Sequence, residues 1–252
     1  MREGLLREIC SVFEDAGFNL VKKTPIEKYN ARVSVERRIR NTRNMRKGAR
    51  SAIVAGFGGR EFWEILRRRD AGAPLTGLSD EDTIDDYTRL VFDRASELLR
   101  REGINHRVAF PFGADYFAVD FLTLGEVAGF GTMSLMGILI NPEYGLWMSL
   151  RGAILLEEEL EEYDPPLEGF NPCPECAKPC IAPCPAAAVS VDGWDWRGCM
   201  DWRIENSSCG GGCDSRAACP WGSEHKYSKE QQTYHQSWAL RWARLSKRAQ
   251  DK

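Results

Sequence analysis

The chain of 252 residues is long enough for one substantial hydrophobic core and a small appended module. Its net charge of -3 gives no general attraction toward nucleic acid or an anionic membrane, and no apolar run reaches the roughly 18 residues that indicate a membrane span. The opening residues, MREGLLREIC, contain no apolar signal segment. We therefore expect a cytoplasmic protein whose thiols stay reduced.

The first predicted elements are a helix, a strand and a basic stretch. Apolar residues recur at helical spacing over residues 2–17, so a helix is expected there, ending at Gly17. Residues 18–21 are expected to form a short strand. Residues 22–50 then carry eleven Lys or Arg against two Glu, which we interpret as a solvated surface. A protein partner, a phosphate-bearing ligand or RNA is the alternative.

A strand, a glycine turn and a helix are expected next. Residues 51–55 are apolar and β-like, residues 56–60 read GFGGR, and residues 61–70 follow a helical pattern. This order can place free backbone amides around an anion, although glycine turns also serve plain connections.

A long amphipathic helix is predicted over residues 83–102, with Gly103 after its end. Residues 106–112 read as a strand. Residues 128–141 and 146–156 are expected to form a hairpin through a turn at residues 142–145. Alternating strands and helices up to residue 167 predict a mixed α/β layer domain.

An acidic segment separates this domain from the rest of the chain. Residues 154–168 hold seven acids and no base, and they include two consecutive prolines, so we interpret them as a linker. The predicted division is residues 1–167 as the first domain, residues 168–226 as a cysteine module, and residues 227–252 as a helix that docks on the module. The expected fold class is α+β.

Eight of the nine cysteines lie between residues 173 and 219. In two-cluster bacterial ferredoxins, a run C-x2-C-x2-C-x3-C-P gives three thiolates to one cluster, and its fourth Cys crosses to the other. Here three residues, rather than two, separate the second and third cysteines of the run. With the crossover kept, two [4Fe-4S] clusters use set one (Cys173, Cys176, Cys180 and Cys219) and set two (Cys184, Cys199, Cys209 and Cys213).

Two other uses of the thiols are weighed against iron. Zinc sites usually present two separated C-x2-C pairs, whereas four cysteines here crowd into one short run, and Cys184 and Cys219 each precede a proline. Disulfides do not suit a reducing compartment. The ninth cysteine, Cys10, shares the apolar side of the first helix, so we expect it to be a buried side chain rather than a ligand.

These residues together suggest a family. The stretch A128-G-F-G through N141-P-E-Y-G145, followed by a strand, a linker and cysteines ending C219-P-W, resembles the cobalamin-dependent epoxyqueuosine reductases and, more distantly, the reductive dehalogenases. The resemblance implies a flavin-reductase-like α/β domain that holds a corrinoid, joined to a two-cluster ferredoxin-like module. Thr132, Leu135 and Met136 replace that family's Trp, Lys and Asn. The chain also lacks the extension that helps those enzymes hold tRNA, so a nucleic-acid substrate is not expected.

The resemblance implies roles for residues of the first domain. Asp115 lies thirteen residues before Ala128, the spacing of the family's general acid, although a surface aspartate is an equal reading. Tyr116 is a second candidate proton donor. The candidate contacts to the flat face of a corrinoid are five glycines, Gly56, Gly58, Gly59, Gly129 and Gly131.

The predicted function is an iron-sulfur oxidoreductase that passes electrons through two clusters to a corrinoid, for the reduction of an unknown small molecule. A ferredoxin or flavodoxin is the expected electron donor. The alternative is a non-catalytic electron-transfer or corrinoid-handling protein, because a catalytic pocket normally keeps convergent polar groups that residues 128–137 have lost. A zinc-bound adaptor for RNA or protein is a third reading.

Overall fold

The computed structural model describes residues 1–33, 48–72, 83–113, 119–206 and 208–250. They form two compact units, Met1–Gly131 with Met148–Gly169 and Thr132–Trp147 with Phe170–Lys252. The division therefore differs from a single boundary after residue 167. Residues 132–147 lie between two segments of the first unit in sequence, but they pack with the cysteines.

A four-stranded antiparallel sheet forms the centre of the first unit. The strand order is β1 (Leu20–Pro25), β2 (Ser51–Gly58), β6 (Met148–Leu156) and β3 (His106–Ala109). Every residue of β2 is buried, as expected for an apolar strand with neighbours on both edges. The predicted α+β class is confirmed, with an antiparallel sheet.

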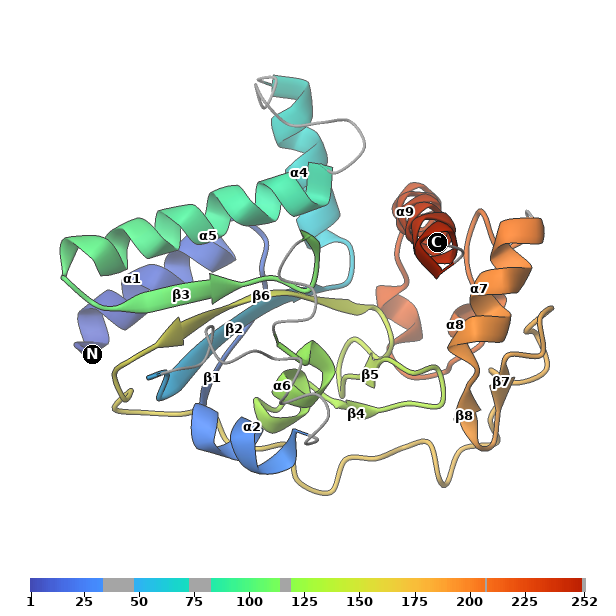
Figure 1. Ribbon diagram of the computed structural model, residues 1–252, viewed down its shortest axis with the longest axis horizontal. Helices are drawn as coiled ribbons and strands as arrows, with labels where there is room; N and C mark the ends of the chain where they lie inside the picture. Colours follow the sequence, from blue (N-terminus) through green and yellow to red (C-terminus); the bar gives the residue numbers. More distant parts are fainter. Residues whose placement is uncertain (34–47, 73–82, 114–118, 207, 251–252) are drawn as a thin grey trace. The chain divides into compact units, whose positions relative to one another are not determined.

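Helices cover both faces of this sheet (Figure 1). On one side lie α1 (Glu3–Glu14) and α5 (Thr83–Arg101), and on the other lie α2 (Ile26–Arg32) and α6 (Phe121–Val127). The helix α4 (Glu61–Gly72) follows β2. A backbone amide at Asp120 donates to the Tyr29 hydroxyl at 2.9 Å, which joins α2 to the start of α6.

The two longest helices predicted for this unit correspond to α1 and α5, and each is followed by a glycine where the chain turns. Both are confirmed, and Gly17 and Gly103, which follow them, adopt the left-handed φ values of 86° and 69° that favour glycine. The ring of Phe92 on α5 lies beneath Gly152 of β6, where an added Cβ would sit 2.6 Å from it. The absence of a side chain at Gly152 therefore lets helix and sheet pack closely.

The predicted glycine turn at residues 56–60 is wrong in its first half. The strand β2 continues through Gly58, with a bulge between Ala55 and Gly56. A Cβ at Gly56 would lie 2.5 Å from the backbone oxygen of Ser149, so glycine allows the neighbouring strand to approach at the bulge.

The predicted hairpin of residues 128–141 with 146–156 is also wrong. The strand β6 pairs with β2 and β3, while β5 (Leu139–Ile140) pairs with β4 (Thr132–Met133). Most of β6 is buried, and it needs long neighbours on both edges that a two-residue strand cannot provide. Closeness in sequence therefore did not predict the partners of β6, because the need to bury β6 decided the pairing.

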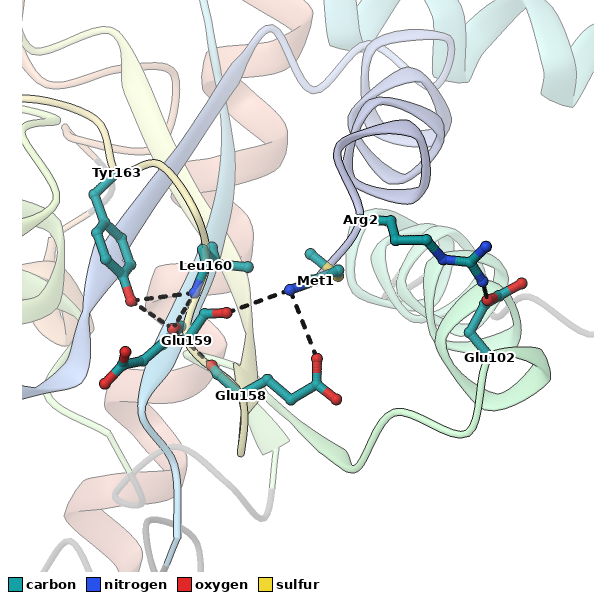
Figure 2. A network of polar contacts seen from close by, with 8 residues as sticks. Met1, Arg2, Glu102, Glu158, Glu159, Leu160 and Tyr163 are labelled. Carbon is teal, nitrogen blue, oxygen red and sulfur yellow. Dashed lines mark hydrogen bonds and ion pairs between the residues drawn. The ribbon is translucent and has the colours of Figure 1, made fainter.

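The acidic segment after β6 is held against the first unit by a polar network (Figure 2). The Ser51 hydroxyl donates to the Glu158 backbone oxygen at 2.8 Å, lies 2.8 Å from the Tyr163 hydroxyl, and accepts from the Leu160 amide at 3.2 Å. The amino group of Met1 lies 3.8 Å from a Glu158 carboxylate oxygen. The predicted linker thus begins as an ordered part of the first unit.

The second unit contains short elements joined by cysteine-bearing loops. They are the ribbons β4–β5 and β7 (Val189–Ser190) with β8 (Gly193–Trp194), the helices α7 (Trp196–Glu205), α8 (Asp214–Ala217) and α9 (Lys229–Gln250), and a 3-10 turn at Ser223–His225. The terminal helix was predicted. It packs on α7, where the Arg203 guanidinium donates to the Gln236 backbone oxygen at 3.2 Å. No helix among the described residues is both long and apolar enough to span a membrane.

Candidate iron-sulfur site

The four cysteines of set one line one cavity of the second unit that is partly open to solvent. Three of them come from the loop of residues 173–180, and Cys219 comes from the turn after α8. The remaining walls are mostly apolar and consist of Leu135, Ile140, Pro172, Pro179, Pro220 and Trp221, with Lys178 beside them. The cavity therefore gathers four sulfurs inside a surface that offers few competing ligands.

The charges of these thiols act on one another. Burial raises the pKa of Cys219, the Trp221 backbone amide lowers it by donating to the sulfur, and charge at Cys180, Cys173 and Cys176 raises it further. The pKa of Cys180 is likewise raised, first by burial and also by charge at Cys173 and Cys176. The thiols that act on Cys219 and on Cys180 all belong to set one.

Set two shows the same internal coupling. Burial raises the pKa of Cys199, and charge at Cys184 and Cys209 raises it further. Burial also raises the pKa of Cys213, with added contributions from charge at Cys199 and Cys209. The thiols that raise the pKa of Cys199 and of Cys213 thus all belong to set two.

Different elements deliver the cysteines of set two. Cys184 lies in the loop before β7, Cys199 lies on α7, Cys209 lies in the following loop, and Cys213 is the N-cap of α8. The side chain of Asp195 caps α7 by accepting from the Gly198 amide at 3.1 Å, which fixes the turn that carries Cys199.

Backbone amides point at sulfurs in both sets. The Lys178 amide donates to the Cys176 sulfur at 3.4 Å, and the Ala188 amide donates to the Cys184 sulfur at 3.3 Å. Lys178 and Ala187 have positive φ values of 57° and 48°, which is uncommon for residues with a side chain. A strained backbone conformation persists only where the surrounding structure requires it. Here Lys178 and Ala187 lie in the two loops whose backbone amides donate to cysteine sulfurs.

Two buried polar atoms of the second unit lack a partner in the part of the protein that the structure describes. The Ser215 hydroxyl, two residues after Cys213, and the Trp147 indole nitrogen have no hydrogen-bond partner among the described residues. Burying such groups is unfavourable unless a partner is supplied. In the described ranges, no three His, Cys, Asp or Glu side chains are grouped to hold a single metal ion. The residues around set one, with four thiols, donor amides and few competing side chains, fit a thiolate-bound cluster.

The segment 132–147 supplies part of this site. Ile140, Leu146 and Cys219 form a buried cluster, against which Met136, Ile138 and Phe170 pack. Leu135 and Met136, which stand where the resembled enzymes have Lys and Asn, therefore pack around set one. The sequence pattern placed residues 132–147 in the cofactor domain. Their packing around set one is visible only in the structure.

The glycines predicted to approach a corrinoid have other contacts in the structure. Both backbone groups of Gly58 bind the Asn19 side chain, at 3.1 and 2.8 Å, and a Cβ at Gly129 would lie 2.9 Å from the Pro165 backbone oxygen. Gly59 has a φ of 69° at the end of β2, and Gly131 is buried. Together with the strand contact of Gly56, these contacts show that Gly56, Gly58 and Gly129 do not form an open cradle.

Two predicted residues lie outside the described part of the chain. Asp115 and Tyr116, the candidate proton donors, belong to residues 114–118, and about half of the basic stretch of residues 22–50 falls within residues 34–47. Their predicted roles stay predictions.

Sequence reasoning missed three side chains that act on set two. The Trp194 indole donates to the Cys199 sulfur and lowers that thiol's pKa, as does the charge of Arg203. Arg216 lowers the pKa of Cys213 through its backbone amide and its charge. The only signal in the sequence was proximity to cysteines, which does not reveal side-chain direction.

Comparisons with known proteins agree on the fold. No protein-family model and no curated protein matches the sequence. The epoxyqueuosine reductase of Streptococcus thermophilus superposes with a TM-score of 0.56 at 16% identity, over 86% of this chain and 66% of that one. A reductive dehalogenase, whose structure suggests a mechanism for B12-dependent dehalogenation, gives 0.55 at 16% identity, over 94% and 33%. The B12-trafficking protein CblC of C. elegans gives 0.53 at 10% identity, over 96% and 97%.

The resemblance inferred from the cysteine module and residues 128–145 is therefore confirmed in the fold. The chain spans about two thirds of the length of that epoxyqueuosine reductase and about one third of the dehalogenase, whereas its match with CblC covers nearly all of both chains. At these identities the likeness establishes the shared architecture.

Proposed function

We propose that this protein is an iron-sulfur oxidoreductase that binds two [4Fe-4S] clusters, one at each cysteine set. The observation that carries the proposal is the pocket lined by Cys173, Cys176, Cys180 and Cys219, and it is supported by the mutual effect of the remaining thiols on the pKa values of Cys199 and Cys213. A cluster of this type takes four thiolates, so the two groups account for all eight.

Bound clusters would supply one-electron transfer, and the chain's own residues would tune it. The thiols of each set would serve as ligands, while amides such as those of Lys178 and Ala188 would stabilise negative charge on the sulfurs. Apolar side chains, including Leu135 and Ile140, would keep water from set one. In this proposal a cytoplasmic ferredoxin or flavodoxin donates the electrons.

The electron acceptor in the first unit is proposed to be a corrinoid, and the reduced substrate a small molecule. This part rests on the likeness to B12-associated proteins. Gly56, Gly58 and Gly129 do not fit the group as an open cradle, so no reaction step is assigned through it. Asp115 and Tyr116 stay candidates for delivering a proton to the substrate. Unchanged turnover in an Asp115→Asn variant would remove the first.

Anaerobic purification tests the central proposal. We expect about eight irons and a matching amount of sulfide per chain, because each cluster carries four irons. A visible spectrum and cobalt analysis, before and after incubation with cobalamin, would then report corrinoid binding. Zinc in place of iron would contradict the proposal and revive the adaptor reading.

A second candidate function is corrinoid handling without turnover of a substrate. It is favoured by the match with CblC, which extends over 96% of this chain and 97% of that one. Cobalamin bound by the iron-loaded protein, with no reduction of any tested substrate under reducing conditions, would favour this candidate. Iron without corrinoid affinity would indicate an electron carrier.

A further inference from the structure

Two hollows lie on the helices α7 and α9 of the second unit, which pack side by side (Figure 1). The first lies between the two helices and includes Ala243 and Lys247 in its lining. The second lies on α9 alone and includes Leu240 and Arg244. Residues three or four apart are neighbours on a helix, so the two hollows adjoin and form one surface. We call the residues that line them the α7–α9 face.

The α7–α9 face is basic, although the whole chain has a net charge of -3. Its charged residues are one acid, Asp201, and four exposed bases, Arg197, Arg241, Arg244 and Lys247. The Lys247 amine donates to the Asp201 carboxylate at 3.1 Å. Residues 237–250 of α9 contain no Asp or Glu. The face therefore keeps an excess of positive charge, which attracts a negatively charged partner.

Apolar side chains lie among these charges. Trp196 is 38% exposed and Leu245 is 55% exposed. The guanidinium carbon of Arg197 lies 4.7 Å from the centre of the Trp196 ring. Aromatic residues and Arg are enriched in protein interfaces relative to the rest of the surface. The composition of the face therefore favours a protein partner.

The helices that form the face also hold set two. Cys199 lies on α7. At the start of α9, the side chain of Lys229 lies against the glycine loop between the last two cysteines of set two, where a Cβ added at Gly211 would be 2.8 Å from the Lys229 amine nitrogen. A protein bound to the face would thus lie beside the elements that hold set two, and electron transfer between proteins becomes faster as the distance shortens.

We propose that the α7–α9 face docks a small acidic electron-transfer protein, of the flavodoxin kind, beside set two. In each transfer the docked protein is oxidised by one electron and the iron-sulfur site of this chain is reduced by one. The inference rests on the proposed function, because that function requires an electron donor.

Two other occupants fit the face less well. A second copy of this chain would bring the same positive charges against the face in a symmetric contact, which is repulsive. RNA would match the charge, but it cannot supply the electrons that the proposed function needs. The charge of the face and its place beside set two together favour the redox protein.

Isothermal titration calorimetry of the iron-loaded full chain with an acidic flavodoxin, at low and at high salt, tests the docking. Arg241→Glu combined with Arg244→Glu reverses two charges of the face. The matched control combines Arg94→Glu with Arg101→Glu, because these two arginines are exposed on α5 and give the same change of net charge. Iron content and circular dichroism are measured first in every variant. If the double Glu variant of the face does not fold, Arg241→Gln combined with Arg244→Gln replaces it.

We expect the face variant to bind flavodoxin about tenfold more weakly than the wild type at low salt, with a smaller difference at high salt, where the charges are screened. The control pair should bind like the wild type. Stopped-flow absorbance should show that reduced flavodoxin reduces the face variant more slowly than the wild type. A small uncharged reductant should reduce both at the same rate.

If the iron-loaded wild type did not bind flavodoxin, or bound it no more tightly than the face variant, the inference would be overturned. Equal weakening in the control pair would also overturn it. So would binding of a single-stranded RNA oligonucleotide, or dimerisation in sedimentation, that the face variant loses while its flavodoxin affinity stays unchanged. Wild-type protein without iron would instead refute the proposed function.

Discussion

Set one comes mainly from a single loop, whereas set two is assembled from four separate places in the second unit. Three cysteines of set one lie within residues 173–180 and need only Cys219 to close their cavity. The cysteines of set two lie before β7, on α7, in a loop and at the N-cap of α8. The first arrangement depends on local backbone geometry and the second on helix packing.

The surroundings of the two sets differ in the same way. Set one is walled by apolar side chains and prolines, with Lys178 as the cation beside it. Set two is influenced by the charges of Arg203 and Arg216 and by the indole of Trp194. We infer that the apolar side chains around set one chiefly exclude water. The polar groups near set two would chiefly adjust the reduction potential of the cluster proposed there.

The largest expected effect is the loss of iron when cysteines of one set or of both sets are replaced. Cys180→Ala and Cys219→Ala should each reduce iron from about eight to about four per chain, because each removes a ligand of the same cluster. The double variant should also keep about four. Combining Cys180→Ala with Cys213→Ala should remove nearly all iron, since it affects both sets. Iron and sulfide analysis checks this, and a total loss in the Cys180/Cys219 pair would contradict the grouping.

The next largest effect is expected at Gly145, whose backbone lies against that of Trp221 beside set one. A Cβ at Gly145, which has a φ of 56°, would lie 1.8 Å from the Trp221 backbone oxygen. Gly145→Ala should therefore cost about 2–4 kcal/mol of unfolding free energy through strain and overpacking. It should also loosen set one, because the Trp221 amide donates to Cys219.

Thermal unfolding of the loaded protein measures this loss. Gly169→Ala is the control, because Gly169 has a similar φ of 69° but nothing within 4 Å of the added carbon. Equal losses of stability in the two variants would show that the close contact between Gly145 and Trp221 contributes nothing to the cost.

A smaller effect is expected at Trp194. Trp194→Phe keeps an aromatic ring against Gly137 but removes the donor to the Cys199 sulfur, so the potential of the set-two cluster should become more negative. Trp202→Phe is the matched control, because the Trp202 indole donates to the Ser208 hydroxyl at 3.2 Å. A redox titration in which both variants behave like the wild type would exclude a role for the indole.

The smallest effect is expected at Cys10, the one cysteine outside both sets. Burial raises its pKa, so less of it is thiolate near neutral pH than of an exposed cysteine, and its reaction with iodoacetamide should be slow and accelerate as pH rises. Mass spectrometry of the iron-loaded protein reads out the alkylation. Cys10→Ala should leave the iron content unchanged, and any loss of iron would make Cys10 part of the site.

Local patterns predicted much of this molecule. Helical spacing and the glycines that follow located α5 to within one residue and α1 to within about three residues at each end, because such helices need only one apolar face and a left-handed residue at the end. The same reasoning failed for the hairpin at residues 128–156. Strand pairing depends on which partner buries β6, and that partner, β2, is almost a hundred residues earlier in the chain.

The sequence by itself determined the cysteine pattern, the expected crossover of Cys219, and the resemblance that the fold comparisons confirmed, because these depend on residue type and spacing. Tertiary structure alone decided that residues 132–147 pack with the cysteines and that Trp194, Arg203 and Arg216 lower the pKa of cysteines in set two. Such contacts join residues far apart in the chain, and their directions follow from packing and electrostatics rather than from any local pattern.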